Sequence, residues 1–98
     1  MEFSTACIHH TPRFDEPTGS VTTPIYLTST FAHLGLGRST GYDYTRTQNP
    51  TRQSDEDTVA QLEQGADALA FSPGMAAISC LMELFSPGDH IVTSFDLY

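Results

Sequence analysis

The sequence predicts an α/β fold, on the strength of three neighbouring segments. A short apolar run, ALAF at 68–71, precedes a Ser-Pro-Gly turn, and a nearly continuous apolar segment, MAAISCLMELF, follows at 75–85. After a Pro-Gly-Asp break comes HIVTSF at 90–95, which is rich in β-branched and aromatic residues. Strand, helix and strand in this order form a βαβ unit, whose two strands should be parallel and joined by a right-handed crossover. We therefore expect the first unit of a larger parallel sheet.

The first fifty residues have no helical period and are rich in Thr, Ser, Gly and Pro. Their most strand-like passage, VTTPIYLTSTFAH at 21–33, contains Pro24, which cannot donate to a central position of a sheet. Three glycines between 35 and 41 should make the following loop flexible. We therefore expect residues 1–50 to form an extended arm laid across another surface, and residues 51–98 to begin a larger domain.

The segment after Asn-Pro-Thr predicts a helix over residues 52–64. Thr51 can cap its N-terminus, and three acidic residues at 55–57 lie in the early turns, where the helix dipole favours negative charge. Gly65 can supply the left-handed residue that ends the helix.

The charge balance limits the possible partners. The chain has twelve Asp and Glu residues, four Arg and no Lys, which gives a formal charge of −8 at pH 7. Because duplex nucleic acid and anionic membranes bind clustered basic residues, both are disfavoured as partners. No apolar run is long enough to span a bilayer, the N-terminus lacks a signal-peptide pattern, and Cys7 and Cys80 lack the spacing of a metal site. We expect a cytoplasmic protein with reduced thiols and no metal.

The turn FSPGMAA at 71–77 is the place where such a fold binds ligands, since it follows the carboxyl end of a strand. The amides of Gly74 and Met75 would point out of the helix N-terminus, whose partial positive charge favours a phosphate group. The turn matches neither the Walker loop nor the Gly-x-Gly-x-x-Gly fingerprint, which disfavours a nucleotide. An ordinary strand-to-helix turn also uses Gly for its conformation alone, so this segment by itself fits both interpretations.

Three more side chains are candidates for an anion site. Tyr98 follows the second predicted strand and would emerge at the same sheet edge as Gly74, although packing on its neighbours is the commoner role of such a tyrosine. Tyr44 and Arg46 are two residues apart in a segment expected to be extended, so a phenol and a guanidinium can bind one anion from the same face. The alternative for Arg46 is a surface ion pair, worth about 0 to 1 kcal/mol.

Together these segments resemble the pyridoxal 5'-phosphate (PLP) enzymes of cysteine and methionine metabolism, a group that includes cystathionine γ-synthase, cystathionine γ-lyase, methionine γ-lyase and the O-acylhomoserine sulfhydrylases. The matching stretches, in order, are TGSVTTPIYLTSTF, GYDYTRTQNPTR, LEQGADALAFSPGMAAI and PGDHIVTSFDLY. The resemblance implies the fold type I PLP-dependent transferase fold, which is aspartate aminotransferase-like, with residues 1–50 as a dimer-interface arm and 51–98 as the start of the PLP-binding large domain. It also implies a lyase or transferase of trans-sulfuration, which performs replacement or elimination on cystathionine, O-acylhomoserine or a related amino acid.

Position by position, the resemblance implies a role for each candidate. The amides of Gly74 and Met75 would hold the PLP phosphate, and Tyr98 would stack on the pyridine ring. Tyr44 and Arg46 would reach the phosphate in the neighbouring subunit's site, within a homodimer or homotetramer. The lysine that holds the cofactor as a Schiff base is absent, so no catalytic residue is expected in this chain. We expect it to be the inactive N-terminal portion of a longer enzyme.

Two departures from the family pattern keep another interpretation open. Family members carry Ser or Thr in place of Pro73 and a leucine in place of Asp55. Asp55 would share the inner stripe of its helix with Val59 and Leu62, where an unpaired carboxylate costs about 1 to 3 kcal/mol. Such lapses suit a non-catalytic remnant that only associates with a full-length relative. A third hypothesis, a free-standing phosphate-binding βαβ module, would leave the apolar helix at 75–85 uncovered.

Overall fold

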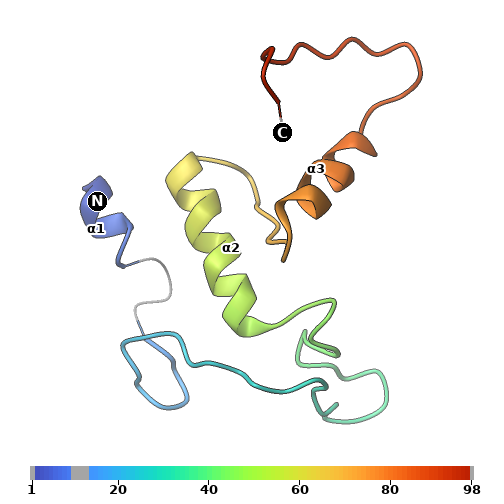
Figure 1. Ribbon diagram of the computed structural model, residues 1–98. Coiled ribbons are helices and arrows are strands. Elements are labelled where there is room, and N and C mark those ends of the chain that lie inside the picture. The colour runs from blue at the N-terminus through green and yellow to red at the C-terminus, as the bar shows by residue number, and fades with distance from the viewer. Residues whose placement is uncertain (1, 10–13, 98) are drawn as a thin grey trace.

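The computed structural model describes residues 2–9 and 14–97 and shows three helices there. They are α1 (Phe3–Ala6), α2 (Pro50–Glu63) and α3 (Gly74–Met82). The segment that leads to α2 passes beneath the N-terminal end of this helix, and the segment after α3 extends as a long loop (Figure 1). None of these helices is long and apolar enough to cross a membrane.

Helix α2 begins two residues earlier than predicted, and its cap differs. Asn49 has an extended backbone, with φ −148° and ψ 134°, and its side chain accepts a hydrogen bond from the Thr51 amide at 2.8 Å. Pro50 occupies the first helical position, where a missing N–H costs nothing and the fixed φ favours the helix. The prediction of Thr51 as the cap is therefore wrong, because the Asn-Pro pair before it already satisfies the helix end.

The C-terminal end of α2 also differs by one residue from the prediction. Gln64, not Gly65, takes the left-handed conformation, with φ 55° and ψ 30°. The Gly65 amide then donates to the Ala60 carbonyl at 2.9 Å, which closes the last turn. The helix therefore stops without a glycine at the left-handed position.

The side of α2 that contacts the rest of the chain is polar. Glu56 is only 8% exposed, whereas Asp55 is exposed and Val59 is 46% exposed. The expectation that Asp55 lies on a buried stripe is therefore wrong for the described residues. The helix instead turns Glu56, one residue further along, toward the segment that leads to α3.

Neither predicted strand forms a ladder. Segments 68–71 and 90–95 carry no strand, and the one bridge in the described part of the chain joins Thr30 and Tyr44 in antiparallel orientation. A strand exists only where a second segment accepts and donates its backbone hydrogen bonds, and the described residues supply none beside these two runs. The intervening helix does form, as α3, although it ends three residues earlier than predicted.

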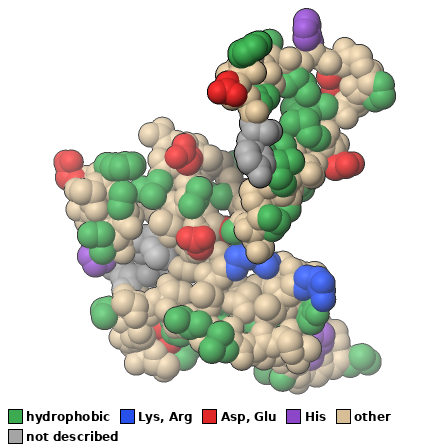
Figure 2. All heavy atoms as spheres, viewed as in Figure 1, with side chains coloured by type: hydrophobic (Ala, Val, Ile, Leu, Met, Phe, Trp, Pro, Cys, Tyr) green, Lys and Arg blue, Asp and Glu red, His purple; other side chains and the backbone are tan. Residues whose placement is uncertain are grey.

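The described residues bury little apolar surface. Ala6 is their one buried hydrophobic side chain, while those of Met75, Ile78, Leu81 and Met82 on α3 are 44% to 51% exposed. Hydrophobic side chains spread over the lobe that contains α3 (Figure 2). The radius of gyration is 17.4 Å, against about 13 Å for a compact domain of this length. The lack of a packing surface for α3 weighs against a free-standing βαβ module.

Candidate functional site

The turn into α3 presents two backbone donors. Pro73 caps the helix with φ −96° and ψ 142°, and its carbonyl accepts from the Ala76 amide at 3.0 Å. No side chain caps this end, and within residues 2–9 and 14–97 no atom accepts a hydrogen bond from the amides of Gly74 and Met75. These amides lie at a helix N-terminus, where the helix dipole favours an anion. Two N–H groups are therefore available to an acceptor from outside the described residues.

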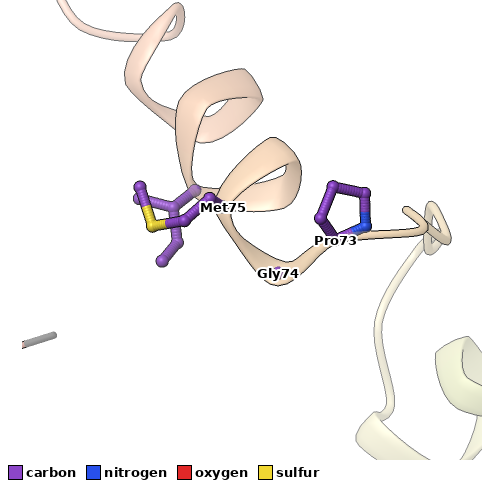
Figure 3. Close-up of a pocket in the computed structure, with 4 residues that line it drawn as sticks. Pro73, Gly74 and Met75 are labelled. Carbon is purple, nitrogen blue, oxygen red and sulfur yellow. The ribbon is translucent and has the colours of Figure 1, made fainter.

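Space is available beside Gly74 and Met75. A Cβ built on Gly74 would meet no atom within 4 Å, and the backbone there lies outside the left-handed region. A pocket of about 460 Å³ is lined by Pro73, Gly74, Met75 and Ile78. The Pro73 ring lies on one side of Gly74 and the Met75 side chain on the other (Figure 3). The start of α3 thus combines open space with two amides that lack an acceptor among the described residues, and Pro73 has no N–H to add.

Tyr44 and Arg46 lie together, but through a turn. Residues 45–47 form a turn that the amides of Thr47 and Gln48 close on the Tyr44 carbonyl, each at 3.0 Å. Arg46 Nη2 donates to the Tyr44 hydroxyl at 3.2 Å, and its guanidinium carbon lies 5.6 Å from the ring centroid. The predicted extended conformation is wrong, because two hydrogen bonds to one carbonyl hold the backbone in a turn.

The Arg46 guanidinium is free of acidic partners in the described part of the chain. Arg46 is exposed and Tyr44 is 39% exposed. The ion pairs of the described residues join His33 with Asp43 and Arg52 with Glu56, so the surface ion pair considered for Arg46 does not form there. Its guanidinium can bind an anion without first breaking a pair.

Asn49 joins the turn to the arm and to α2. Its side chain is 7% exposed, and Nδ2 donates to the Tyr26 carbonyl and to Thr45 Oγ1, both at 3.1 Å. Thr51 adds a second link, since its hydroxyl donates to the Pro24 carbonyl at 3.1 Å and accepts from the Tyr26 amide at 2.9 Å. The Asn-Pro-Thr segment thus fixes the arm against the first turn of the helix.

Arg52 holds the same turn from the helix side. Nη1 donates to the carbonyls of Thr45 and Arg46 at 3.3 and 3.4 Å, and Nη2 donates to the Thr47 carbonyl at 2.5 Å. The third nitrogen, Nε, lies 3.4 Å from Glu56 Oε1; it is buried and forms this ion pair without a directed hydrogen bond. Arg52 therefore acts within the fold, whereas Arg46 points outward.

Asn49, Arg52 and Glu56 were not predicted as site-forming residues. The sequence does contain signals for them. An Asn directly before Pro at the start of a helical segment is typical of an N-cap, and Arg52 and Glu56 have the i,i+4 spacing of a helical ion pair. Neither signal indicates which loop carbonyls or amides the side chains will bind.

A polar cluster closes the loop before Tyr44. His33 Nε2 lies 2.7 Å from Asp43 Oδ1, and the Ser39 hydroxyl donates to the same oxygen at 2.6 Å. The Ser39 hydrogen bond lowers the pKa of the Asp43 carboxyl, His33 lowers it further, and partial desolvation opposes both effects. Because Ser39 and His33 both bind the carboxylate, the cluster is not arranged as a nucleophile and its base. Its geometry fixes the loop.

The candidate residues fall into two separate groups. Gly74 and Met75 lie at the start of α3, while Tyr44 and Arg46 lie near the start of α2, and no hydrogen bond or ion pair among the described residues joins Gly74 or Met75 directly to Tyr44 or Arg46. Tyr98, predicted to lie beside Gly74, falls outside the described residues.

Comparisons with known proteins agree with the resemblance seen in the sequence. The family model "Cys/Met metabolism PLP-dependent enzyme" matches residues 4–98. The cystathionine gamma-synthase/O-acetylhomoserine (thiol)-lyase of Bacillus subtilis is 58% identical over 86 residues, which are 88% of this chain and 23% of that protein. The cystathionine gamma-lyase of the same organism is 48% identical over 98 residues, which are 100% of this chain and 26% of that protein.

Solved structures give the same assignment. Cystathionine gamma-lyase from Lactobacillus plantarum, complexed with L-serine, superposes with a TM-score of 0.81 at 44% identity and covers 92% of this chain and 23% of its own. Cystathionine gamma synthase from Xanthomonas oryzae pv. oryzae, in complex with aminoacrylate and cysteine, superposes with a TM-score of 0.82 at 39% identity. The match covers 91% of this chain and 23% of that chain. The chain thus spans about a quarter of these relatives, and its backbone follows the N-terminal part of the fold type I enzymes, although the predicted strands are not formed.

Proposed function

The chain belongs to the PLP-dependent enzymes of cysteine and methionine metabolism, and we propose that it forms the N-terminal part of a trans-sulfuration lyase or transferase. The observation that carries this proposal is the pair of open amides of Gly74 and Met75 at the start of α3. A helix N-terminus with free donors and open space suits a phosphate monoester such as that of PLP.

The residues present fit the phosphate end of the cofactor. Gly74 and Met75 would hold the phosphate through their backbone N–H groups, and Tyr98 would stack on the pyridine ring. When bound, PLP supplies an electron sink for reactions at the α-, β- and γ-carbons of an amino acid. The substrate class we propose is cystathionine, O-acylhomoserine or a related sulfur amino acid, and the reaction is replacement or elimination at the γ- or β-carbon.

Tyr44 and Arg46 would serve the site of a neighbouring subunit. Three observations support this role: the two side chains lie together, both are exposed, and no described carboxylate occupies the guanidinium. The domain assignment that goes with it takes residues 1–50 as an interface arm and residues 51–98 as the start of the large domain, within a homodimer or homotetramer.

The competing proposal is a non-catalytic remnant that associates with a full-length relative. Pro73 favours it, because this residue removes one backbone donor and a hydroxyl from the phosphate turn. Asp55 does not support it, because its carboxylate is exposed and therefore has no desolvation cost. Of the two departures from the family pattern, only one still favours the remnant, and we therefore prefer the enzyme.

The nucleotide sequence after the codon for Tyr98 separates the two proposals. A reading frame that continues into a lysine-bearing PLP domain supports the enzyme, and a stop codon at that position refutes it. The next test uses the complete gene product, isolated with PLP and assayed by visible absorption before and after borohydride reduction. A protein that acquires no cofactor absorption contradicts the proposal.

Replacement of Arg46 by Ala tests the role of the arm. The variant should retain PLP about ten-fold less tightly, since it loses a charge-assisted hydrogen bond to phosphate. Arg38→Ala is the matched control, because Arg38 is an exposed arginine of the same loop region. Equal PLP retention in the two variants would show that Arg46 does not bind the cofactor.

A further inference from the structure

Glu56 connects α2 to the segment that leads to α3. Its Oε1 accepts a hydrogen bond from the Ala70 amide at 2.8 Å. Ala70 lies four residues before Gly74, in the loop between the two helices. The Glu56 side chain is 9% exposed, so this contact is shielded from water. The carboxylate thereby fixes the backbone that delivers the Gly74 turn.

The same carboxylate oxygen also faces Arg52, which holds the other group of candidate residues. Arg52 Nε lies 3.4 Å from Glu56 Oε1, and its two terminal nitrogens donate to three successive carbonyls, those of Thr45, Arg46 and Thr47. This ion pair therefore lies between the turn that carries Arg46 and the loop that carries Gly74.

We propose that Arg52 and Glu56 are positioning residues that fix the Tyr44–Thr47 turn relative to the Gly74 turn, and so couple two phosphate-binding elements. The coupling rests on the proposed function, in which Gly74 serves its own subunit's PLP and Arg46 serves the neighbour's. One such pair in each subunit would then link the two sites of a dimer. Neither residue touches the cofactor in this proposal.

The physical basis is the cost of leaving the buried Glu56 carboxylate or its Arg52 partner without the other. If Glu56 loses its charge, the Arg52 guanidinium keeps three carbonyl acceptors but loses the one counter-charge that holds it against α2. The turn at 45–47 then opens more often. If Arg52 is shortened, Glu56 keeps the Ala70 amide but is left with an unpaired, poorly hydrated charge, which loosens the loop before Gly74. Each substitution should therefore also affect the segment that the altered residue does not contact.

The test is hydrogen exchange on the complete gene product, together with its dissociation constant for PLP. In Glu56→Gln, the amide oxygen can still accept from Ala70, so exchange at Ala70 should change by less than about three-fold, while Thr47 and Gln48 exchange about ten-fold faster. In Arg52→Gln, which removes the counter-charge of Glu56, Ala70 should exchange several-fold faster although Arg52 does not touch it. Both variants should bind PLP about ten-fold more weakly.

Asp57→Asn is the matched control. It removes one negative charge from the adjacent helical position, and the partner of the Asp57 carboxylate among the described residues is Gln53, within α2. This variant should leave the exchange of both segments and the PLP affinity unchanged. If Glu56→Gln does not fold, Arg52→Gln carries the same test, because its distant effect is read at Ala70.

The proposal is overturned if each substitution alters only the segment it contacts, or if both variants behave like Asp57→Asn. Unchanged PLP affinity together with altered exchange also overturns it, since the pair would then be a structural contact without influence on the site. Failure of the proposed function looks different. In that case no variant binds PLP, while the exchange pattern still decides whether the pair connects the two segments.

Discussion

Replacement of Asn49 by Ala should open the junction between the arm and α2. In the structure this side chain accepts from the Thr51 amide at 2.8 Å and donates to the Tyr26 carbonyl and to Thr45 Oγ1 at 3.1 Å. The residue is 7% exposed, so water cannot replace these partners without the junction opening. Ala removes all three contacts at once. Ser keeps an N-cap oxygen but is too short to reach the other two partners.

The size of the effect follows from these contacts. Loss of an N-cap side chain costs about 1 kcal/mol, and loss of each of the two remaining hydrogen bonds costs about 1 kcal/mol. Asn49→Ala should therefore lower the free energy of local opening by about 3 kcal/mol, and Asn49→Ser by about 2 kcal/mol. Since 1.4 kcal/mol is a factor of ten, amide exchange should rise by about 100-fold and about 30-fold respectively.

The assay is native-state hydrogen exchange of the complete gene product, followed at amides in residues 44–53. The Gln53 amide, which donates to the Asn49 carbonyl at 2.9 Å, reports on the first turn of α2. When the segment recloses faster than the open amides exchange, the ratio of two exchange rates gives the difference in opening free energy. A rise of less than about three-fold in Asn49→Ala would refute the reasoning. Equal rates in the Ala and Ser variants would show that the cap itself contributes nothing.

Three further predictions concern other contacts of the same region. Thr51→Val keeps the shape of the side chain but loses the links to Pro24 and Tyr26, so urea denaturation should show a loss of about 1 to 2 kcal/mol, and an unchanged midpoint would contradict the bridging role. Gln64→Gly relieves a left-handed backbone at φ 55° and should stabilise the protein by about 1 kcal/mol, whereas Gly65→Ala serves as the control without that gain. The Asp43 pKa lies below its ordinary value of 3.8, so its contribution to the closure of the loop is fully present above about pH 4 and is lost as the pH falls through the lower folded value. Exchange at the Phe31 amide, which donates to the Asp43 carbonyl, should therefore rise in acid, and Asp43→Asn should abolish that pH dependence.

The sequence allowed α2 and α3 to be predicted because their signals are local, whereas the short helix α1, in the segment expected to be extended, was not predicted. The nearly continuous apolar composition of 75–85 and the turn residues on either side were enough to locate α3, and the change of pattern after Pro50 located α2 to within two residues. The caps were harder to predict. At the N-terminus both Asn49 and Thr51 are residue types that cap helices, and at the C-terminus Gly65 is one. The backbone geometry decides which position becomes the cap.

The predictions of the two strands and of a buried Asp55 were wrong because they depend on contacts with distant parts of the chain. Segments 68–71 and 90–95 have strand composition, but a ladder needs a partner that the described residues do not provide. Asp55 was placed on an inner stripe because Val59 and Leu62 follow at helical spacing, yet the polar face with Glu56 is the one that meets the next segment. Helical periodicity identifies faces and does not tell which neighbour each face will meet.

Burial differs between the polar junction of the arm with α2 and the apolar faces of α3. Among the described residues Asn49 and Glu56 are buried, while the apolar side chains of α3 remain about half exposed. The place of the arm on α2 is therefore specified by polar contacts between residues of this chain, whose geometry is directional. The place of α3 depends on apolar surfaces that these residues do not supply. A substitution at the junction should consequently change where Arg46 is presented, whereas a substitution on the apolar faces of α3 should change whether the Gly74 turn is held at all.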